Sequence, residues 1–251
     1  MPAGEVTTDY LTIIVLAFLG PFVLSFDSRV HFYKKWRPLV ASMLIIAPIY
    51  IFWDAVATER GDWWFSGDHT SGITILGLPL AEVLFFLVVP YACIFIYEVL
   101  IYYLGDQELP FNRWVYVMVA VALLVMAVVF IDQYYTATVL VFTAAFLYIA
   151  AVLYPAILRA RAYWQYALMS LVPFFIVNYL LTSIPIVLYS DEAIWGPRIS
   201  TIPAEDLIYN FSMLSFYLLV YVYFKRRWGV DTDNEAVPRE VGTGRGLPEV
   251  E

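Results

Sequence analysis

Acidic residues follow two prolines that open long apolar segments of this chain. Pro79 is followed by Glu82, and Pro203 is followed by Glu205 and Asp206. Carboxyl groups that enter a membrane are costly to bury, so they indicate function by default. A carboxylic acid that an apolar site keeps neutral, with aromatic rings around it, is suited to donating a proton to an alkene. The residue types and their spacing therefore predict acid chemistry near one end of the apolar segments.

The two acidic motifs belong to a longer internal repeat. Residues 54–90 match residues 178–214 without a gap at an offset of 124, which aligns Asp54 with Asn178. The register holds from one apolar segment through a loop into the next. Related segments of this kind pack about a common axis in many membrane proteins. We therefore expect the polar groups of both copies to meet in a central cleft, as candidate catalytic residues: Asp54, Glu82, Asn178, Glu205 and Asp206.

The elements that must position these groups are membrane helices. Hydrophobic residues make up 62% of the chain and charged residues 14%, against roughly 25% charged residues in soluble domains. Apolar runs of about 20 residues, each long enough to span a bilayer, recur along the chain. We predict seven spans, at about 9–26, 38–56, 78–103, 112–131, 135–156, 164–186 and 204–226. The fold class is thus all-α, an integral membrane bundle of about seven transmembrane helices.

The offset of 124 relates spans that run in the same direction. The bundle is therefore expected to hold two parallel three-helix repeats, at about 9–103 and 135–226, joined by a linker helix at about 112–131. Residues 1–228 form the predicted transmembrane domain. Residues 229–251 are rich in Gly, Pro and acids, which predicts a disordered acidic tail.

Basic residues predict the orientation of the chain in a cell membrane. With seven spans, three basic groups fall on one side: residues 29–37, Arg159 with Arg161, and residues 225–227. The positive-inside rule makes that side cytoplasmic, with the N-terminus outside. His31 and His69 then lie on opposite sides, so no metal site is expected. The glycine-rich string in the tail lacks the strand and helix of a nucleotide loop, and no nucleic-acid partner is expected.

Aromatic residues surround the acidic motifs in both copies. Their faces could stabilise a cation in a substrate pocket, or their Trp and Tyr residues could form an interfacial belt, an alternative that applies most to Trp63 and Trp64. The candidate substrate-binding rings are Trp53, Trp64, Phe65, Phe85, Phe86, Tyr189, Tyr209 and Phe211.

The motifs of both copies resemble a known family. The first copy reads Phe52-Trp53-Asp54, Gly61-Asp-Trp63-Trp64-Phe65 and Leu78-Pro79-Leu-Ala-Glu82; the second reads Asn178-Tyr-Leu-Leu-Thr182, Gly196-Pro-Arg198 and Ile202-Pro203-Ala-Glu205-Asp206. Over about residues 8–228 the chain is similar to the small membrane lycopene cyclases, in a form that fuses two subunits. The resemblance implies that the ψ ends of lycopene, or of other linear carotenoids, become β rings without net redox chemistry. It adds Arg198 and Asn210 to the substrate-binding candidates, and no cofactor is expected.

One position departs from the family pattern. Ala81 stands where the family usually has the first of two acids, and the repeat aligns Ala81 with Glu205. If that carboxylate is the proton donor, this chain is impaired, or it uses Glu82, Glu205 or Asp206 instead. We expect positions 81 and 205 to face the same cleft, and restoring an acid at position 81 to raise the rate of ring formation.

Other protein classes with seven spans are also considered. A retinal photoreceptor needs a lysine within a span, and the chain has only Lys34, Lys35 and Lys225, none of them in the middle of one. A small transporter and a non-catalytic carotenoid-binding protein remain as alternatives. Extraction of pigments from a host that accumulates lycopene separates them from an enzyme, because only an enzyme produces rings.

Overall fold

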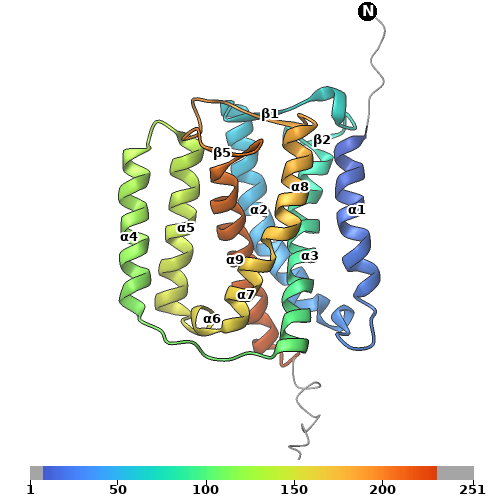
Figure 1. Cartoon of the computed structure of the whole chain (residues 1–251). Coiled ribbons are helices and arrows are strands. Elements are labelled where there is room, and N and C mark those ends of the chain that lie inside the picture. Colours follow the sequence, from blue (N-terminus) through green and yellow to red (C-terminus); the bar gives the residue numbers. More distant parts are fainter. Residues whose placement is uncertain (1–7, 231–251) are drawn as a thin grey trace, which may run out of the picture.

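The computed structural model describes residues 8–230, and most of them are helical (Figure 1). The prediction of a mainly helical bundle is confirmed. The predicted acidic tail lies outside the described residues, apart from Gly229 and Val230. The helices are α1 (Asp9–Leu24), α2 (Trp36–Arg60), α3 (Leu80–Leu104), α4 (Arg113–Val129), α5 (Tyr134–Leu153), α6 (Ala156–Arg159), α7 (Arg161–Met169), α8 (Leu171–Ser183) and α9 (Ala204–Arg227), with short 3-10 helices η1 (Phe32–Lys35) and η2 (Gly67–His69).

Within residues 8–230, five helical segments are long and apolar enough to cross a membrane, which indicates a membrane-embedded protein. They are Phe32–Arg60, Leu80–Leu104, Tyr134–Leu153, Arg161–Ser183 and Ala204–Arg227. Helices α1 and α4 are also apolar, but they have only 16 and 17 residues. Each predicted span therefore corresponds to an observed apolar segment, while the count of seven transmembrane helices stays a prediction.

The sixth predicted span is broken into α7 and α8 at Ser170. Pro173 explains the break, because its ring clashes with the carbonyl group four residues earlier, at Met169, and its nitrogen cannot donate a helical hydrogen bond. As a result α8 begins at Leu171 with a new direction (Figure 1). This change of direction sets the position of Asn178 and Leu181 on α8.

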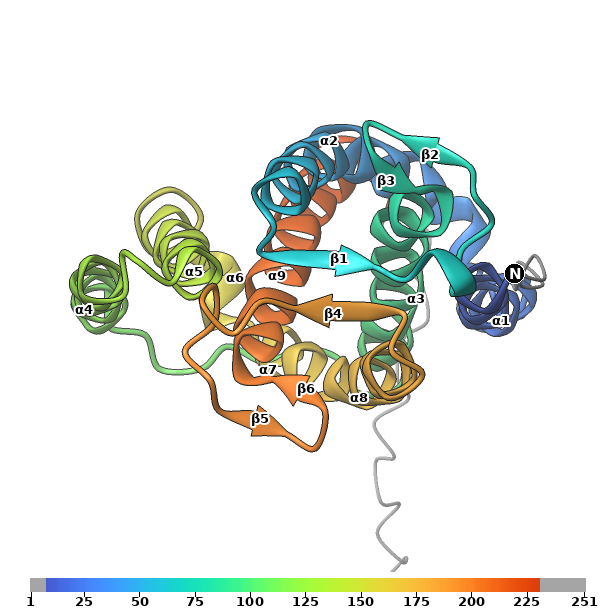
Figure 2. The same ribbon diagram turned by 90° about the horizontal axis from the view of Figure 1, so that it is seen from above.

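Helices α3 and α9 lie inside the bundle, and α1, α2, α5 and α7 pack around them. Helix α1 packs on α3, and α5 packs on α9; α2 packs on both α9 and α3, and α7 packs on α3. Helix α4 packs on α5 at the edge of the molecule (Figure 2). The inner helices therefore carry the acidic motifs into the centre of the bundle.

Six short strands, which the sequence analysis did not predict, close one end of the bundle. Strand β1 (Trp63–Phe65) pairs antiparallel with β4 (Val187–Tyr189), and the two lie side by side across the centre (Figure 2). Trp64 lies opposite Leu188, its own equivalent at the offset of 124. Two hairpins flank this pair, β2 (Thr74–Ile75) with β3 (Leu78–Pro79) and β5 (Arg198–Ile199) with β6 (Ile202–Pro203). The pair β1–β4 therefore joins the two matched segments directly.

The two hairpins turn at matched positions. Leu76 and Ser200, also 124 residues apart, have positive φ angles of 53° and 58°. Each hairpin ends at the proline that opens the next helix, Pro79 before α3 and Pro203 before α9. Proline suits this position because the first N–H groups of a helix have no helical partner. Both hairpins thus set where the acidic first turns begin.

A buried ion cluster joins three elements at the opposite end of the bundle. Glu98 of α3 is fully buried and forms ion pairs with Lys35 of η1 and, at 2.6 Å, with Lys225 of α9. The Tyr221 hydroxyl also donates to Glu98, at 2.8 Å. Buried charges need such partners because an isolated charge is very costly to bury. The cluster therefore ties η1, α3 and α9 together.

Candidate active site

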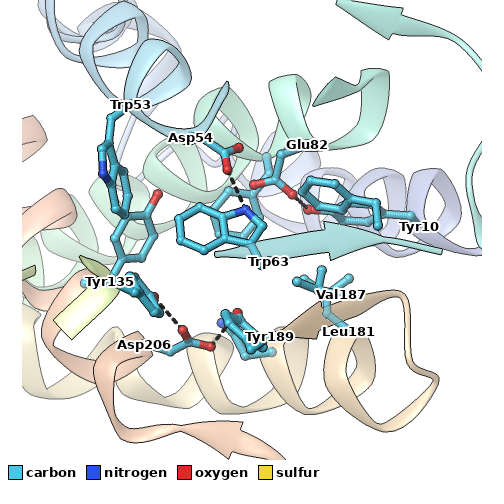
Figure 3. A pocket seen from close by; sticks show the side chains of 14 residues that line it. Tyr10, Trp53, Asp54, Trp63, Glu82, Tyr135, Leu181, Val187, Tyr189 and Asp206 are labelled. Atoms are coloured by element: carbon cyan, nitrogen blue, oxygen red, sulfur yellow. Dashed lines mark hydrogen bonds between the residues drawn. The ribbon is translucent and has the colours of Figure 1, made fainter. Parts of the chain in front are cut away.

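A small cavity lies beneath the β1–β4 pair, where the acidic first turns of α3 and α9 meet. Its volume is about 50 Å³. Figure 3 shows its lining, which comes from both matched segments and from the first turns of α1 and α5. The lining residues are Tyr10, Trp53, Asp54, Trp63, Phe65, Glu82, Phe85, Tyr135, Asn178, Leu181, Val187, Tyr189, Asp206 and Tyr209.

Two carboxyl groups face each other on one side of the cavity. Asp54 near the end of α2 is 2% exposed, and its Oδ1 accepts a hydrogen bond from Trp63 Nε1 at 2.8 Å. Glu82 Oε2 accepts a hydrogen bond from the Tyr10 hydroxyl. The second oxygen of Asp54 makes no hydrogen bond to the described residues, and the Glu82 carboxyl is its neighbour (Figure 3). Two carboxylates that share a site cannot both ionise cheaply, so this pair is suited to holding a proton.

The third carboxyl group, that of Asp206, has a different environment. Tyr135 donates to its Oδ1 at 2.5 Å and Tyr189 donates to its Oδ2 at 2.9 Å (Figure 3). Donors on both oxygens stabilise the ionised form of a carboxyl group. The helix dipole favours negative charge in this first turn of α9 as well. The cavity therefore contains a carboxyl pair suited to donating a proton and a separate carboxylate suited to accepting one.

Tyr189 is held as a hydrogen-bond donor by its surroundings. Burial, and next the neighbouring Asp206 carboxyl, raise the pKa of the Tyr189 phenol well above its usual value of 10.0. The phenol consequently keeps its proton at physiological pH. It can therefore stabilise a charged Asp206 throughout that range.

Aromatic rings form most of the remaining wall. The centroid of Trp63 lies 5.4 Å from that of Trp53 and 5.0 Å from that of Tyr135. Tyr135 stacks on Tyr189 at 5.9 Å, and Trp53 lies 5.4 Å from Tyr209. Ring faces attract positive charge, so this wall is suited to a cationic reaction intermediate.

The structure brings many of the predicted site residues together. The predicted residues that line the cavity are Trp53, Asp54, Phe65, Glu82, Phe85, Asn178, Tyr189, Asp206 and Tyr209. Trp63 and Trp64, the two rings with an alternative interfacial role, differ in their surroundings. Trp63 is buried and donates a hydrogen bond to Asp54, whereas Trp64 is 47% exposed and does not line the cavity.

Positions 81 and 205 do not face this cleft, contrary to expectation. Glu205 is 1% exposed, and its Oε1 accepts hydrogen bonds from Thr136 Oγ1 at 2.6 Å and from the Trp195 backbone N–H at 2.5 Å. Ala81 is buried in the apolar core. Residues next to each other in a helix point about 100° apart, so when Glu82 and Asp206 enter the cavity, Ala81 and Glu205 turn away from it.

Four other predicted residues also lie outside this cavity. Phe86 is fully buried against Tyr50, and Phe211 packs edge-on against Phe146. Arg198 lies on the outside, with its guanidinium 6.0 Å from the Tyr189 ring centroid. Asn210 lines a second cavity instead.

Tyr10 and Tyr135, the donors to Glu82 and Asp206, are not among the predicted site residues. They are equivalent to each other at an offset of 125, one residue more than the offset of the recognised repeat. Extending the comparison into the first helix of each repeat, with one inserted residue, would have found them. Leu181 and Val187 were not selected either, because apolar residues carry no chemical signal in so apolar a chain.

The fold and this cavity define a membrane-embedded helical protein that buries carboxyl groups among aromatic rings. The sequence model of the lycopene cyclase family matches residues 7–100 and 132–224, well over half of the chain. The chain therefore belongs to the lycopene cyclase family, which supports carotenoid cyclase activity in general. Comparisons with curated proteins and with solved structures gave no match. Among the described residues, no group of three or more His, Cys, Asp or Glu side chains is arranged to hold a metal ion.

Proposed function

We propose that this protein is a lycopene β-cyclase, which converts the ψ ends of lycopene or another linear carotenoid into β rings. The observation that carries the proposal is the burial of three carboxyl groups, those of Asp54, Glu82 and Asp206, in one cavity walled by aromatic rings. Family membership supplies the substrate class. The product is an isomer of the substrate, so the enzyme is an isomerase of the intramolecular lyase type.

The reaction begins with a proton from the Asp54–Glu82 pair. The π electrons of the terminal double bond form the new C–H bond and leave a tertiary cation. The next suitably placed double bond attacks this cation, closes the ring by a new C–C bond and moves the positive charge to a ring carbon. Loss of a ring proton then gives the β double bond. One proton is gained and one is lost, so the reaction needs no oxidant or reductant.

Asp206 is the proposed base and the proposed stabiliser of the cation. Tyr135 and Tyr189 favour its ionised form by donating to both of its oxygens. A separate acid and base within one buried cavity is a common way to run proton transfers in both directions at neutral pH. The β1–β4 pair also covers the cavity, and covering a reacting cation limits its capture by water, which would otherwise produce an alcohol.

Ala81, the position that departs from the family pattern, has no catalytic role in this mechanism. Ala81 lies outside the cavity, so we infer that its lack of a carboxyl group does not impair the chain. Glu205 is inferred to be a positioning residue. Its two hydrogen bonds join α9 to Thr136 of α5 and to the loop at Trp195, near the helix turn that carries Tyr135.

We also propose that the chain is built from two parallel three-helix repeats, α1–α2–α3 and α5–α7/α8–α9, with α4 as the linker. The matched packing of α1 on α3 and of α5 on α9 supports this, as does the antiparallel pair of equivalent strands β1 and β4. Seven crossings of a cell membrane would place the N-terminus outside and the C-terminus in the cytoplasm. The acid cavity then lies near the outer leaflet.

Pigment extraction from cells that accumulate lycopene tests the function. The wild-type protein is expected to produce ring-bearing carotenoids. Glu82→Gln and Asp206→Asn keep the size of each side chain but remove its proton chemistry. Each variant is expected to slow ring formation by about 10²–10⁴-fold, the usual contribution of a general acid or base. Glu59→Gln and Asp132→Asn, at exposed positions outside the cavity, are matched controls with wild-type yields of rings.

Two results would contradict the proposal. If the wild-type protein retains lycopene without changing it, the protein is a carotenoid-binding protein rather than an enzyme. If Glu82→Gln and Asp206→Asn produce rings at the wild-type initial rate in membranes with equal protein levels, the acid chemistry does not reside in this cavity.

A further inference from the structure

A second, larger cavity adjoins the acid cavity between α1, α3 and α8. Its volume is about 270 Å³, and Phe85 and Asn178 line both cavities. Its walls are mostly apolar, with Ala17 and Pro21 from α1, Val89 and Ala92 from α3, and Pro173 and Val177 from α8. The two cavities together provide a polar end and an apolar extension. We call the larger cavity the α1–α8 groove.

The groove runs along α3 toward the middle of the bundle. Its lining on α3 extends from Phe85 to Ile96, which is about 16 Å at 1.5 Å per residue. This is about half of the ~30 Å apolar thickness of a bilayer. Ile176, which also lines the groove, is 59% exposed on α8. The groove therefore opens toward the lipid between α1 and α8, which flank α3 (Figure 2).

A buried polar group lies within this apolar groove. Asn210 of α9 is 4% exposed and lines the groove, and its Nδ2 has no hydrogen-bond partner among the described residues. A buried donor without a partner is costly and calls for an explanation. The π electrons of a bound polyene could accept from it, because N–H groups form weak hydrogen bonds with π systems.

The positions that the repeat matches to the groove lining are filled by large rings. At the offset of 124, Ala92 and Cys93 correspond to Phe216 and Tyr217, and Val177 corresponds to Trp53. All three rings pack against the core, although Phe216 and Trp53 are only partly buried. Phe216 lies 5.4 Å from Phe146, Trp53 lies 5.7 Å from Phe142, and Tyr217 is fully buried. The groove between α1, α3 and α8 is therefore open, whereas the matched space between α5, α9 and α2 is filled.

We propose that the α1–α8 groove binds one half of an extended polyene, which enters sideways from the bilayer with its end group leading into the acid cavity. This inference rests on the proposed function for the identity of the ligand. The other half of the chain stays in the lipid. Because the matched path between α5, α9 and α2 is filled by these rings, the two end groups of one substrate enter through the same opening, one at a time.

Blocking the groove tests the inference. Ala92→Phe on α3 introduces the ring found at the matched position 216, and Ala17→Phe narrows the opposite wall on α1. Both side chains extend into existing empty space, so the fold is expected to survive, as protein yield and elution from a sizing column would show. Leu87→Phe, on the same helix at a lipid-exposed position outside the groove, is the matched control.

The measurements are the amount of lycopene that copurifies per protein and the initial rate of ring formation. Ala92→Phe and Ala17→Phe are each expected to reduce both by at least about tenfold, which corresponds to 1.36 kcal/mol. Leu87→Phe is expected to match the wild type in both. Glu82→Gln is expected to retain lycopene and to lose only ring formation, which separates binding from chemistry.

The outcomes for the groove and for the enzyme can be told apart. If the wild type and both groove variants retain lycopene equally, the groove assignment is overturned, whatever the rate of ring formation. If the wild type retains lycopene without producing rings, and the groove variants lose the lycopene, the groove assignment stands and the proposed cyclase activity is wrong.

Discussion

At the scale of single residues, the carboxyl groups of the cavity differ in the donors around them. Asp206 accepts from two phenols, whereas Asp54 and Glu82 face each other and each accept one hydrogen bond from a neighbouring ring. The same side-chain chemistry can therefore act as acid on one side and as base on the other. The proposed roles of acid and base therefore depend on the tyrosines as well as on the carboxyl groups.

Tyr189→Phe should slow ring formation by about 10- to 100-fold, because a hydrogen bond to a charged group contributes about 1.5–3 kcal/mol. The ring and its stacking on Tyr135 would remain, so bound lycopene should be unchanged. Initial rates in membranes with equal protein levels provide the measurement. Tyr179→Phe, on the exposed side of α8, is the control. Equal rates for Tyr189→Phe and the wild type would show that Asp206 does not need this donor.

Ala81→Glu should not increase the rate of ring formation, since position 81 lies in the apolar core outside the cavity. The sequence alone favours the opposite result, because the repeat aligns Ala81 with an acid. A comparison of initial rates, corrected for protein level, distinguishes the two expectations. A tenfold increase would return position 81 to the catalytic residues and would require a rearranged first turn of α3.

At the scale of elements, the β1–β4 pair is the lid of the cavity and joins the two matched segments. The Ser190 N–H donates to the backbone carbonyl oxygen of Asp62, and the Ser66 N–H donates to that of Ile186, each at 2.9 Å. Alternation along an antiparallel pair then makes Trp64 and Leu188 a hydrogen-bonded pair. The lid carries Trp63 and Tyr189, so its pairing positions two of the residues that surround the carboxyl groups.

Leu188→Pro should open this lid, because proline removes the N–H that pairs with Trp64. We expect a loss of ring products and the appearance of hydroxylated acyclic carotenoids, since water admitted to the cavity would capture the cation. Leu188→Ala keeps the N–H and serves as the control. Chromatography of extracted pigments checks both products. Normal ring yields from Leu188→Pro would contradict the role of β1–β4 in excluding water.

The sequence predicted the helices of this fold better than its short strands. Each apolar run gave a helical segment, because apolar length is a direct requirement of the bilayer. The strands have two or three residues each, too few for an alternating pattern to be recognised. The site was also predicted only in part. The acids that follow the prolines could be found in the sequence, but the direction of the Glu205 side chain depends on the rotation of α9, which the β5–β6 hairpin sets. Tyr10 and Tyr135 were missed because they lie outside the gapless repeat.

At the scale of the whole molecule, the acid cavity and the buried ion cluster around Glu98 lie at opposite ends of the bundle. Glu98 is 16 residues from Glu82 along α3, about 24 Å at 1.5 Å per residue. Its two lysine partners come from η1 and α9. The cluster therefore supports the bundle at the end where the sequence places the basic residues, far from the reacting groups.

Glu98→Gln should destabilise the protein by about 3–5 kcal/mol, because it leaves two buried lysines without their counter-charge. The rate per folded protein should stay near the wild-type value at low temperature. Thermal unfolding in detergent, followed together with ring formation below the unfolding range, separates the two effects. Glu108→Gln, whose ion pair with Arg159 is exposed, should change stability little and is the control.

The position of the acid cavity at one end of the bundle has a consequence for a substrate with two ends. If the substrate binds in the α1–α8 groove as proposed, a polyene whose first end has reacted still holds its second end toward the opposite leaflet. That end reaches the carboxyl groups only after the molecule has left the groove and inverted across the bilayer. The time course should therefore show one-ringed carotenoid rising before the two-ringed product, and adding excess fresh lycopene during the reaction should prolong that interval. Two-ringed product that appears without this delay would show that both ends react within a single binding event.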